Sequence, residues 1–391
     1  MIKTYSFKLY NRKQNKHLVD LINLSAGIYN HCIALHKRYY RLNGKHLNKV
    51  KLQAHIAKLK KLDKYSHWSN LNSQAIQNIT DRIENAYTLF FRNLKRRNHN
   101  GTSFRIAPPS FKKRIKYKSF TLKQTGYKLY NDNSILIAGK RYKFAKSREI
   151  DGTIKTVTIK RDSIGDLYIF FTCDVSNIYN PVRIGTGKIV GFDFGLKTYL
   201  KASDGNDEVS PLFFKESQSK IKKLNRTLSR KQKSSNHRKQ AKRALAKQHI
   251  KIANQRKDFQ FKLSNQLCSE YDVICLEDLN IKAMQRIWGK KISDLSHSSF
   301  VNILKQQAAK SVVSVVEIPR FFPSSKTCSK CGCVLDELPL KVRSWVCPAC
   351  GVEHDRDFNA AVNILRVGAS TLGRDVVSPD FAGVRMLSAL S

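Results

Sequence analysis

A carboxylate at the end of an apolar strand constrains this chain more than any other feature of its sequence. Residues 187–195 read Gly-Lys-Ile-Val-Gly-Phe-Asp-Phe-Gly, and the apolar run predicts a buried strand that is interrupted by Asp193 and closed by Gly195. A carboxylate in such a strand costs free energy unless another group pairs with it, and a divalent metal ion is one such partner. The fold is therefore expected to bring further carboxylates toward Asp193.

Two later segments can supply these carboxylates. Residues 272–280 repeat the pattern, since an apolar strand ends there at Glu277 and Asp278. Asp355 and Asp357 precede a stretch whose apolar residues have helical spacing. Three carboxylates from two strand ends and one helix start can bind two Mg²⁺ ions, which activate water and stabilise the leaving oxygen in phosphodiester hydrolysis.

Each of these acids also has an ordinary structural explanation. Asp193 can be a turn residue at a strand end, Glu277 can be exposed, and either Asp355 or Asp357 can cap the following helix. Their order in a strongly basic chain, two strand ends and then a helix start, favours the shared metal site. At this level Asp355 and Asp357 remain alternatives for the third position.

Five of the nine cysteines lie within 23 residues, which in a cytosolic protein favours metal binding over disulfides. Cys328 and Cys331 form one Cys-x-x-Cys pair, Cys347 and Cys350 form the other, and fifteen residues separate the pairs. Four thiolates at this spacing predict a closed tetrahedral Zn²⁺ site with a structural role. Free thiols or a redox pair are the alternatives, and Cys333 is a substitute ligand that breaks the spacing.

The charge of the chain predicts its partner. The net charge is +43 at pH 7, from 72 lysines and arginines against 29 acidic residues, and nucleic acid is the leading candidate for a matching polyanion. An anionic membrane surface is the alternative, but no amphipathic anchor stands out and no apolar run approaches membrane-spanning length. The N-terminus also lacks the apolar stretch of a signal peptide, so we expect a cytosolic protein that does not bind a membrane.

The first half of the chain changes its periodicity near residue 101. Before this point, apolar residues recur at helical spacing over residues 18–33 and 76–94. Beyond it, short strands with a period of two are predicted at residues 119–122, 134–137, 157–159 and 167–173. With a first strand at residues 2–10, they indicate a small antiparallel barrel or sandwich.

Residues 215–257 form the most basic segment. They hold sixteen lysines and arginines and a single acid, Glu216. The apolar residues form only a thin helical stripe, and residues 234–236 (Ser-Ser-Asn) predict a break that makes a helical hairpin. A charge run is often only a solvated face, but a run this one-sided repels itself unless phosphates neutralise it, which favours nucleic-acid contact.

In combination, these motifs resemble those of the TnpB family, which are transposon-encoded RNA-guided DNA endonucleases similar in architecture to the compact type V CRISPR nucleases. The matching segments are residues 191–196, 228–231, 274–280, 323–332, 347–351 and 355–361. Through this resemblance Asp193, Glu277 and Asp357 correspond to the catalytic triad of the family, which selects Asp357 over Asp355.

The resemblance also implies a mixed α/β, multidomain fold. It consists of a RuvC-like nuclease domain with an RNase H-like fold, a zinc ribbon inserted before the last acidic motif, and an N-terminal wedge barrel interrupted by a helical recognition domain. The expected boundaries are residues 1–12 and 101–183 for the wedge β-barrel, 13–100 for the recognition domain, 184–322 and 354–370 for the nuclease domain, 323–353 for the zinc ribbon and 371–391 for a weakly ordered tail.

The function that the resemblance implies is RNA-guided DNA cleavage. A guide RNA derived from the transposon end pairs with target DNA, the protein reads a short flanking motif, and Mg²⁺ at the acids and structural Zn²⁺ at the cysteines are the expected cofactors. We expect a monomer or a dimer in the prokaryotic cytoplasm, associated with the nucleoid. A DNA transposase that uses the same acids for strand transfer and a non-catalytic zinc-ribbon repressor are the alternatives.

Overall fold

The computed structural model describes residues 2–100, 106–176, 184–195, 198–281, 284, 286, 289 and 294–373. The chain forms two compact units, residues 1–180 and 181–391, and each is described by itself. Of the tail predicted to be weakly ordered, residues 371–391, the part from 374 onward lies outside the described residues.

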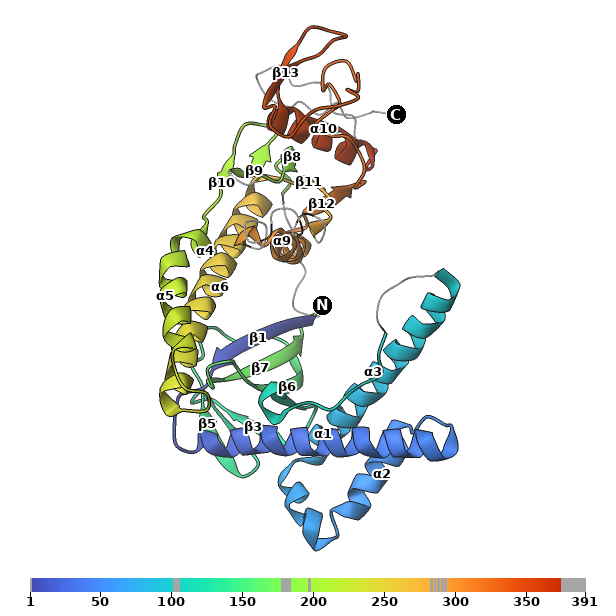
Figure 1. The fold of residues 1–391 in the computed structure, drawn as a ribbon, viewed down its shortest axis with the longest axis vertical. Coiled ribbons are helices and arrows are strands. Elements are labelled where there is room, and N and C mark those ends of the chain that lie inside the picture. Colours follow the sequence, from blue (N-terminus) through green and yellow to red (C-terminus); the bar gives the residue numbers. More distant parts are fainter. Residues whose placement is uncertain are drawn as a thin grey trace. The chain divides into compact units, whose positions relative to one another are not determined.

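The first unit contains two antiparallel sheets, with strand orders β1-β7-β6-β2 and β3-β4-β5 (Figure 1). Their strands are β1 (Ile2–Lys8), β2 (Ser119–Leu122), β3 (Tyr127–Tyr130), β4 (Ser134–Ile137), β5 (Lys140–Lys143), β6 (Thr153–Arg161) and β7 (Leu167–Asp174). An isolated antiparallel bridge between Leu9 and Phe144 connects the two sheets. All strands predicted from the period of two are present, because their alternate residues are buried in one shared core.

Helices complete the core of this unit. They are α1 (Asn15–Asn43), α2 (Lys49–Leu59) and α3 (Ser73–Asn100), with short 3₁₀ helices at Asp63–Asn70 and Arg114–Lys116. Both α1 and α3 contact β2 and each other, and α2 packs on α3. The apolar stripe of α1, which includes Leu18, Ile22 and Ile33, is fully buried, as its helical spacing predicts.

By length and composition alone, α1 could cross a membrane, so the expectation that no apolar run approaches this length is wrong. Half of its most apolar window is buried inside the unit. The apolar residues of α1 therefore serve the core that they share with α3 and the strands.

The second unit is built on a five-stranded mixed sheet with the order β10-β9-β8-β11-β12. Its strands are β8 (Ile189–Asp193), β9 (Thr198–Ala202), β10 (Glu208–Val209), β11 (Val273–Glu277) and β12 (Ser314–Ile318). β8, β11 and β12 run parallel, and Phe192 pairs with Leu276. The last residues of β8 and β11, Asp193 and Glu277, therefore lie at the same edge of the sheet.

Helices cover both faces of this sheet. One face packs on α6 (Asn236–Glu270) and α9 (His297–Ser311), through a core that contains Phe192, Leu276 and Phe300. The other face packs on α10 (Arg356–Ser370), through a core that contains Cys275 and Leu365. Figure 1 shows α6 and α9 on the side of the sheet opposite α10.

A glycine allows α10 to approach the sheet closely. A Cβ atom at Gly191 would overlap the backbone of Ala361 and Leu365, so any larger residue in the middle of β8 would push the helix away. This close packing fixes the start of α10 relative to the ends of β8 and β11.

The basic segment forms the predicted helical hairpin. It consists of α4 (Phe213–Glu216), α5 (Gln218–Ser229) and α6, and the chain turns at Ser234, whose φ is 72°. Ser235 caps α6, because its hydroxyl oxygen accepts a hydrogen bond from the backbone N–H of Arg238 at 3.1 Å.

Candidate metal centres

The alternation of side chains along β8 and β11 decides where their carboxylates point. Successive residues of a strand face opposite sides of a sheet. Ile189 and Cys275 belong to the core under α10, so Asp193 and Glu277, at even offsets from them, face the same side. Asp357 lies in the first turn of α10 on that side. The fold thus brings the three predicted acids to one region.

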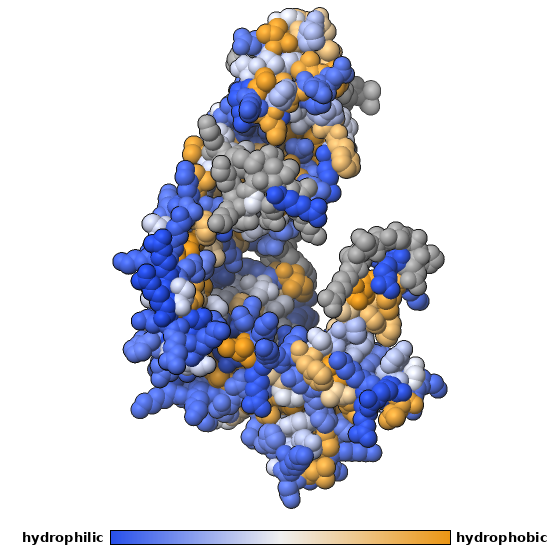
Figure 2. Space-filling view, viewed as in Figure 1, coloured by the Kyte–Doolittle hydropathy of each residue, from blue (hydrophilic) through white to orange (hydrophobic). Residues whose placement is uncertain are grey.

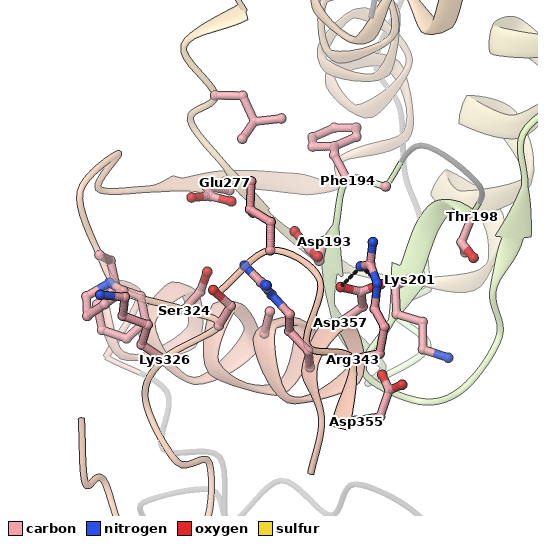
Figure 3. Close-up of a pocket in the computed structure, with 18 of the residues that line it drawn as sticks. Asp193, Phe194, Thr198, Lys201, Glu277, Ser324, Lys326, Arg343, Asp355 and Asp357 are labelled. Atoms are coloured by element: carbon pink, nitrogen blue, oxygen red, sulfur yellow. Dashed lines mark hydrogen bonds and ion pairs between the residues drawn. The ribbon is translucent and has the colours of Figure 1, made fainter. Parts of the chain in front are cut away.

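These three carboxylates line a single cavity of about 750 Å³ within the second unit. Figure 3 shows Asp193, Glu277 and Asp357 around one space, with Asp355 at its edge. The remaining lining residues include apolar side chains, hydroxyl groups and cations, among them Phe194, Thr198, Lys201, Leu279, His297, Phe322, Ser324, Lys326 and Arg343. The cavity can therefore admit an extended polar ligand up to the carboxylates.

The electrostatics of the cavity favour a cation. Burial and the negative charges of Glu277 and Asp357 raise the pKa of Asp193 to about 8. Burial, together with the charge of Asp278, also raises the pKa of Glu277. Both shifts mean that negative charge is under-compensated at the sheet edge, and a divalent cation held by carboxylate oxygens compensates it.

The helix cap distinguishes Asp355 from Asp357. Asp355 ends the short strand β14 (Glu353–Asp355), and its carboxylate accepts a hydrogen bond from the backbone N–H of Phe358 at 2.8 Å. It is the N-cap of α10. Asp357 instead pairs with the guanidinium of Arg343 at 3.3 Å. Both acids line the cavity, but the helix cap engages the carboxylate of Asp355 and not that of Asp357.

The carboxylates share the cavity without forming a tight cluster. Among the described residues, the only group of three or more histidine, cysteine or acidic side chains whose ligand atoms all lie within 4.8 Å of one another is the set of four cysteines. The acids are near enough for the charges of Glu277 and Asp357 to raise the pKa of Asp193, yet open space remains between the three carboxyl groups. The donor set still fits Mg²⁺, because it consists of carboxylate oxygens beside open space.

The sequence interpretation missed three side chains in this cavity. Arg343 pairs with Asp357, and Lys201, which donates to Asp207 at 2.6 Å, adds a second cation. His297 is 2% exposed, and both of its ring nitrogens lack a hydrogen-bond partner in the described structure. Burial lowers the pKa of His297 to about 4, so it stays neutral. A lone arginine, lysine or histidine carries no pattern that could have assigned it to the site.

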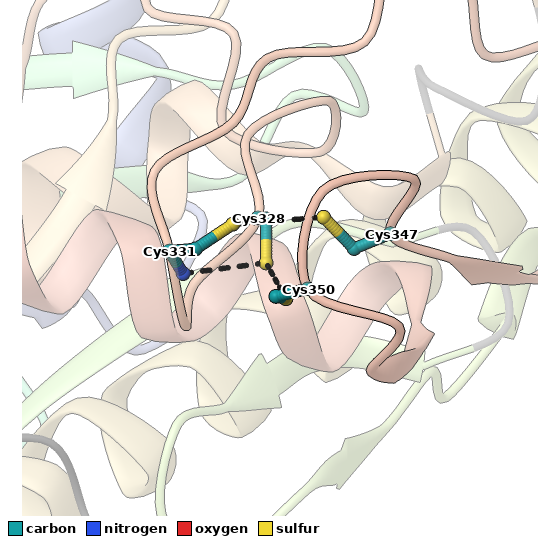
Figure 4. A group of neighbouring side chains, drawn as sticks. All are labelled: Cys328, Cys331, Cys347 and Cys350. Atoms are coloured by element: carbon teal, nitrogen blue, oxygen red, sulfur yellow. Dashed lines mark hydrogen bonds between the residues drawn. The ribbon is translucent and has the colours of Figure 1, made fainter.

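The four predicted cysteines form a compact second centre (Figure 4). The Sγ atoms of Cys328 and Cys350 are 3.7 Å apart, and those of Cys331 and Cys347 are 3.6 Å apart. A tetrahedral ion with Zn–S bonds near 2.3 Å requires sulfur–sulfur distances of about 3.8 Å. The group can therefore hold a metal ion with the geometry that zinc prefers.

Local turns create this arrangement. Gly332 and Gly351, each one residue beyond a Cys-x-x-Cys pair, have φ values of 80° and 68°, which favour glycine. Their N–H groups donate to the carbonyls of Cys328 and Cys347 at 2.9 Å. Cys333 lies outside the group of four, and its carbonyl accepts from the N–H of Cys328 at 2.8 Å.

A histidine contacts the cysteine cluster from the next strand. His354 lies in β14, which pairs with β13 (Ser344–Val346), and its Nε2 is 3.0 Å from the Sγ of Cys328. Its ring also lies 4.8 Å from that of Trp345. His354 was not among the predicted ligands, because its distance from the cysteines in sequence matches neither pair.

The hairpin of α5 and α6 presents its basic residues to solvent. Figure 2 shows a hydrophilic surface over α5. Its exposed cations include Lys220, Lys222, Lys223, Arg226, Lys231, Lys233, Lys239 and Lys242. Such a surface suits contact with phosphates, as the charge run predicts.

Two families match successive parts of the chain. Residues 171–288 match the family described as a probable transposase, OrfB of IS605, and residues 297–364 match the Cas12f1-like TNB domain. Both matches include acids of the cavity: Asp193 and Glu277 lie in the first, and Asp357 lies in the second with all four cysteines.

Similar proteins extend over most of the chain. A putative RNA-guided DNA endonuclease of Streptomyces pristinaespiralis is 28% identical over 347 residues, which cover 87% of this chain and 83% of that protein. The putative RNA-guided DNA endonuclease InsQ of Escherichia coli K12 is 27% identical over 364 residues, which cover 88% of this chain and 87% of that protein.

A solved structure supports the fold. The mini-RNA-guided endonuclease CRISPR-Cas_phi3 has a TM-score of 0.51 and 10% identity, covering 94% of this chain and 92% of that one, which shows likeness of fold alone. Together with the sequence matches, these findings confirm the predicted resemblance: over most of its length the chain is similar to proteins named putative RNA-guided DNA endonucleases.

Proposed function

We propose that this protein is the RNA-guided DNA endonuclease of a transposon. The observation that carries the proposal is the convergence of Asp193, Glu277 and Asp357 on one cavity, in a chain whose relatives are named RNA-guided DNA endonucleases. A guide RNA from the transposon end pairs with target DNA, and the protein reads a short motif beside the target.

Each part of the chain has a role in this proposal. Residues 184–322 and 354–370 act as a RuvC-like nuclease domain, and residues 323–353 act as a zinc ribbon with Zn²⁺ on Cys328, Cys331, Cys347 and Cys350. Residues 1–12 and 101–183 form the wedge barrel, and residues 13–100 form the recognition domain. The exposed cations of α5 and α6 bind phosphates of the nucleic acids.

For the nuclease step, Asp193, Glu277 and Asp357 would hold Mg²⁺ through their carboxylate oxygens. Metal ions held there would supply the activation of a water and the stabilisation of the leaving oxygen. The apolar wall formed by Phe194 and Phe322 restricts water around the strand, and Lys201 and Lys326 attract its phosphates into the cavity.

Strand transfer by the same acids is less well supported. The family described as a probable transposase matches only residues 171–288, whereas the relatives that cover most of the chain are named endonucleases. A repressor without catalysis would not require three acids at one cavity.

The test is to purify the protein together with its native locus, sequence the bound RNA, and assay cleavage of a matching DNA library with Mg²⁺. We expect a discrete RNA from the transposon end and cleavage beside a fixed motif. Cleavage should disappear after RNase treatment and in Asp193→Ala, which should still bind both nucleic acids. Cleavage that survives RNase treatment would contradict guide dependence, and a wild type that binds but never cuts would support the repressor.

A further inference from the structure

Two asparagines fasten the helix that carries Asp357 to the loop that leads into the cysteine cluster. Asn359 and Asn363 lie four residues apart on α10 and are 1% and 4% exposed. A buried carboxamide needs hydrogen-bond partners. Both side chains find these partners in residues 324–329.

The hydrogen bonds hold the backbone on both sides of Cys328. The Nδ2 of Asn359 donates to the carbonyl of Thr327 at 2.8 Å, and its Oδ1 accepts from the N–H of Ser329 at 2.9 Å. The Nδ2 of Asn363 donates to the same carbonyl of Thr327 at 2.7 Å. Movement of Cys328 therefore transmits directly to α10.

The same bonds reach the wall of the carboxylate cavity. The Nδ2 of Asn363 also donates to the carbonyl of Ser324 at 2.9 Å, and Ser324 lines the cavity together with Ser325 and Lys326. One asparagine thus contacts both the loop of the cysteine cluster and a wall of the acidic site.

The strand before α10, β14, also connects the helix to the cysteine cluster. The Sγ of Cys328 contacts the Nε2 of His354 at 3.0 Å, and His354 is followed by Asp355, the N-cap of α10. Asp357 lies two residues further on. The start of α10 is therefore connected to Cys328 in two ways. One connection runs through His354, which precedes the helix, and the other runs through the two asparagines within the helix.

We propose that Asn359 and Asn363 are positioning residues that couple the cysteine cluster to Asp357, so that a metal ion on the thiolates sets the place of the third carboxylate. The identity of the two ions rests on the proposed function. Coupling between two binding sites is reciprocal, so a divalent cation at the acids must tighten zinc binding by the same factor as zinc tightens binding of that cation.

The test measures this factor with Mn²⁺ as the probe. Zinc affinity of the guide-bound protein is determined by competition with a chromogenic chelator at several Mn²⁺ concentrations, and Mn²⁺ affinity is determined by electron paramagnetic resonance. We expect Mn²⁺ to tighten zinc binding by about 5-fold or more in the wild type. Asn363→Leu, which removes the bonds to Thr327 and Ser324, should reduce this factor toward one.

Matched variants separate coupling from folding. Asn302→Leu is the control, because the one hydrogen bond of the Asn302 side chain within the described part of the chain goes to the carbonyl of Ser298 in its own helix, and the variant should keep the full factor. Asn359→Gln retains a carboxamide and should therefore keep part of the factor by which Mn²⁺ tightens zinc binding. In cleavage assays Asn363→Leu should lower kcat with little change in the KM for DNA, because Asp357 is displaced while nucleic-acid contacts remain.

Two results would overturn the proposal: zinc affinity that does not depend on Mn²⁺ in the wild type, or full coupling in Asn363→Leu. If that variant does not fold, the wild-type measurement and Asn359→Gln decide the question. A wild type that shows the coupling but never cleaves DNA would refute the proposed function and leave the coupling intact.

Discussion

The two candidate metal centres of this protein are assembled in opposite ways. The four cysteine Sγ atoms already lie within 4.8 Å of one another, whereas the three carboxylates share a cavity without reaching that distance. Local turns place the four cysteine side chains together, whereas burial and the acidic neighbours of Asp193 oppose its ionisation and raise its pKa to about 8. The cysteine cluster is thus arranged by local turns, whereas the three acids keep a wider spacing with open space between them.

The sharpest test of this difference is Asp193→Asn. We expect DNA cleavage to fall by more than about 100-fold, beyond the loss typical of residues that only support a metal ligand, while the zinc content stays at one ion per chain. Cleavage assays and metal analysis of the same preparation measure both.

Asp355→Asn is the matched control for this substitution. Asparagine caps helices about as well as aspartate, so cleavage should change by less than about 10-fold. An equal loss in both variants would contradict the separate roles of the cap and the cavity residue.

The substitution Cys347→Ser tests the cysteine cluster by removing one of its four thiols. We expect loss of zinc, protease sensitivity confined to residues 323–353, and a fall in cleavage of about 10–100-fold, because the ribbon supports Asp357 without touching the scissile bond. Mass spectrometry of limited digests identifies the cut sites. Cys333→Ser should behave as the wild type, and a Cys347→Ser protein that keeps its zinc would contradict the ligand set.

The raised pKa of Asp193 predicts that the stability of the protein depends on pH. Because the pKa of Asp193 is raised to about 8 in the fold, the folded protein holds a proton that the unfolded chain releases near pH 4. The contribution of Asp193 to the free energy of unfolding is therefore fully present below pH 4 and is lost as the pH rises through about 8. In chelator, Asp193→Asn should exceed the wild type by roughly 1–4 kcal/mol in free energy of unfolding at pH 8, and by little at pH 4.

Urea unfolding at both pH values measures this difference. Addition of Mn²⁺ should stabilise the wild type and leave Asp193→Asn unchanged, which reverses the order of the two proteins. If the wild type is the more stable protein in chelator at pH 8, the carboxylate is already compensated without a cation.

The smallest expected effect is that of Arg343→Gln. The ion pair with Asp357 is largely exposed, so its loss should change the free energy of unfolding by less than about 1 kcal/mol. However, the guanidinium competes with a cation for Asp357, and its removal should tighten Mn²⁺ binding by a few-fold. Titration by electron paramagnetic resonance detects this change, and weaker binding would show that Arg343 supports the site.

Features that depend on local sequence could be predicted. The cluster of four cysteines follows from their spacing, and the positions of Asp193 and Glu277 at strand ends follow from apolar runs that end in an acid. The break of the basic hairpin follows from the serines at 234 and 235, which the structure places at the turn and the cap of α6.

Features that depend on the packing of distant segments could not be predicted from the residues alone. The residues alone did not show that Asp355 caps α10, because this role depends on the hydrogen bond from the N–H of Phe358. The roles of Asn359 and His354 depend on a loop that only the fold brings near. The apolar face of α1 carries no sign that it will be covered, which is why its composition also suits a membrane.

The most direct test of the two-centre account is anomalous X-ray diffraction from crystals grown with Mn²⁺ and measured at the manganese and zinc absorption edges. We predict manganese bounded by Asp193, Glu277 and Asp357, and zinc bounded by Cys328, Cys331, Cys347 and Cys350. Manganese that binds elsewhere, or an acidic cavity without manganese at saturating concentration, would contradict the proposed catalytic site.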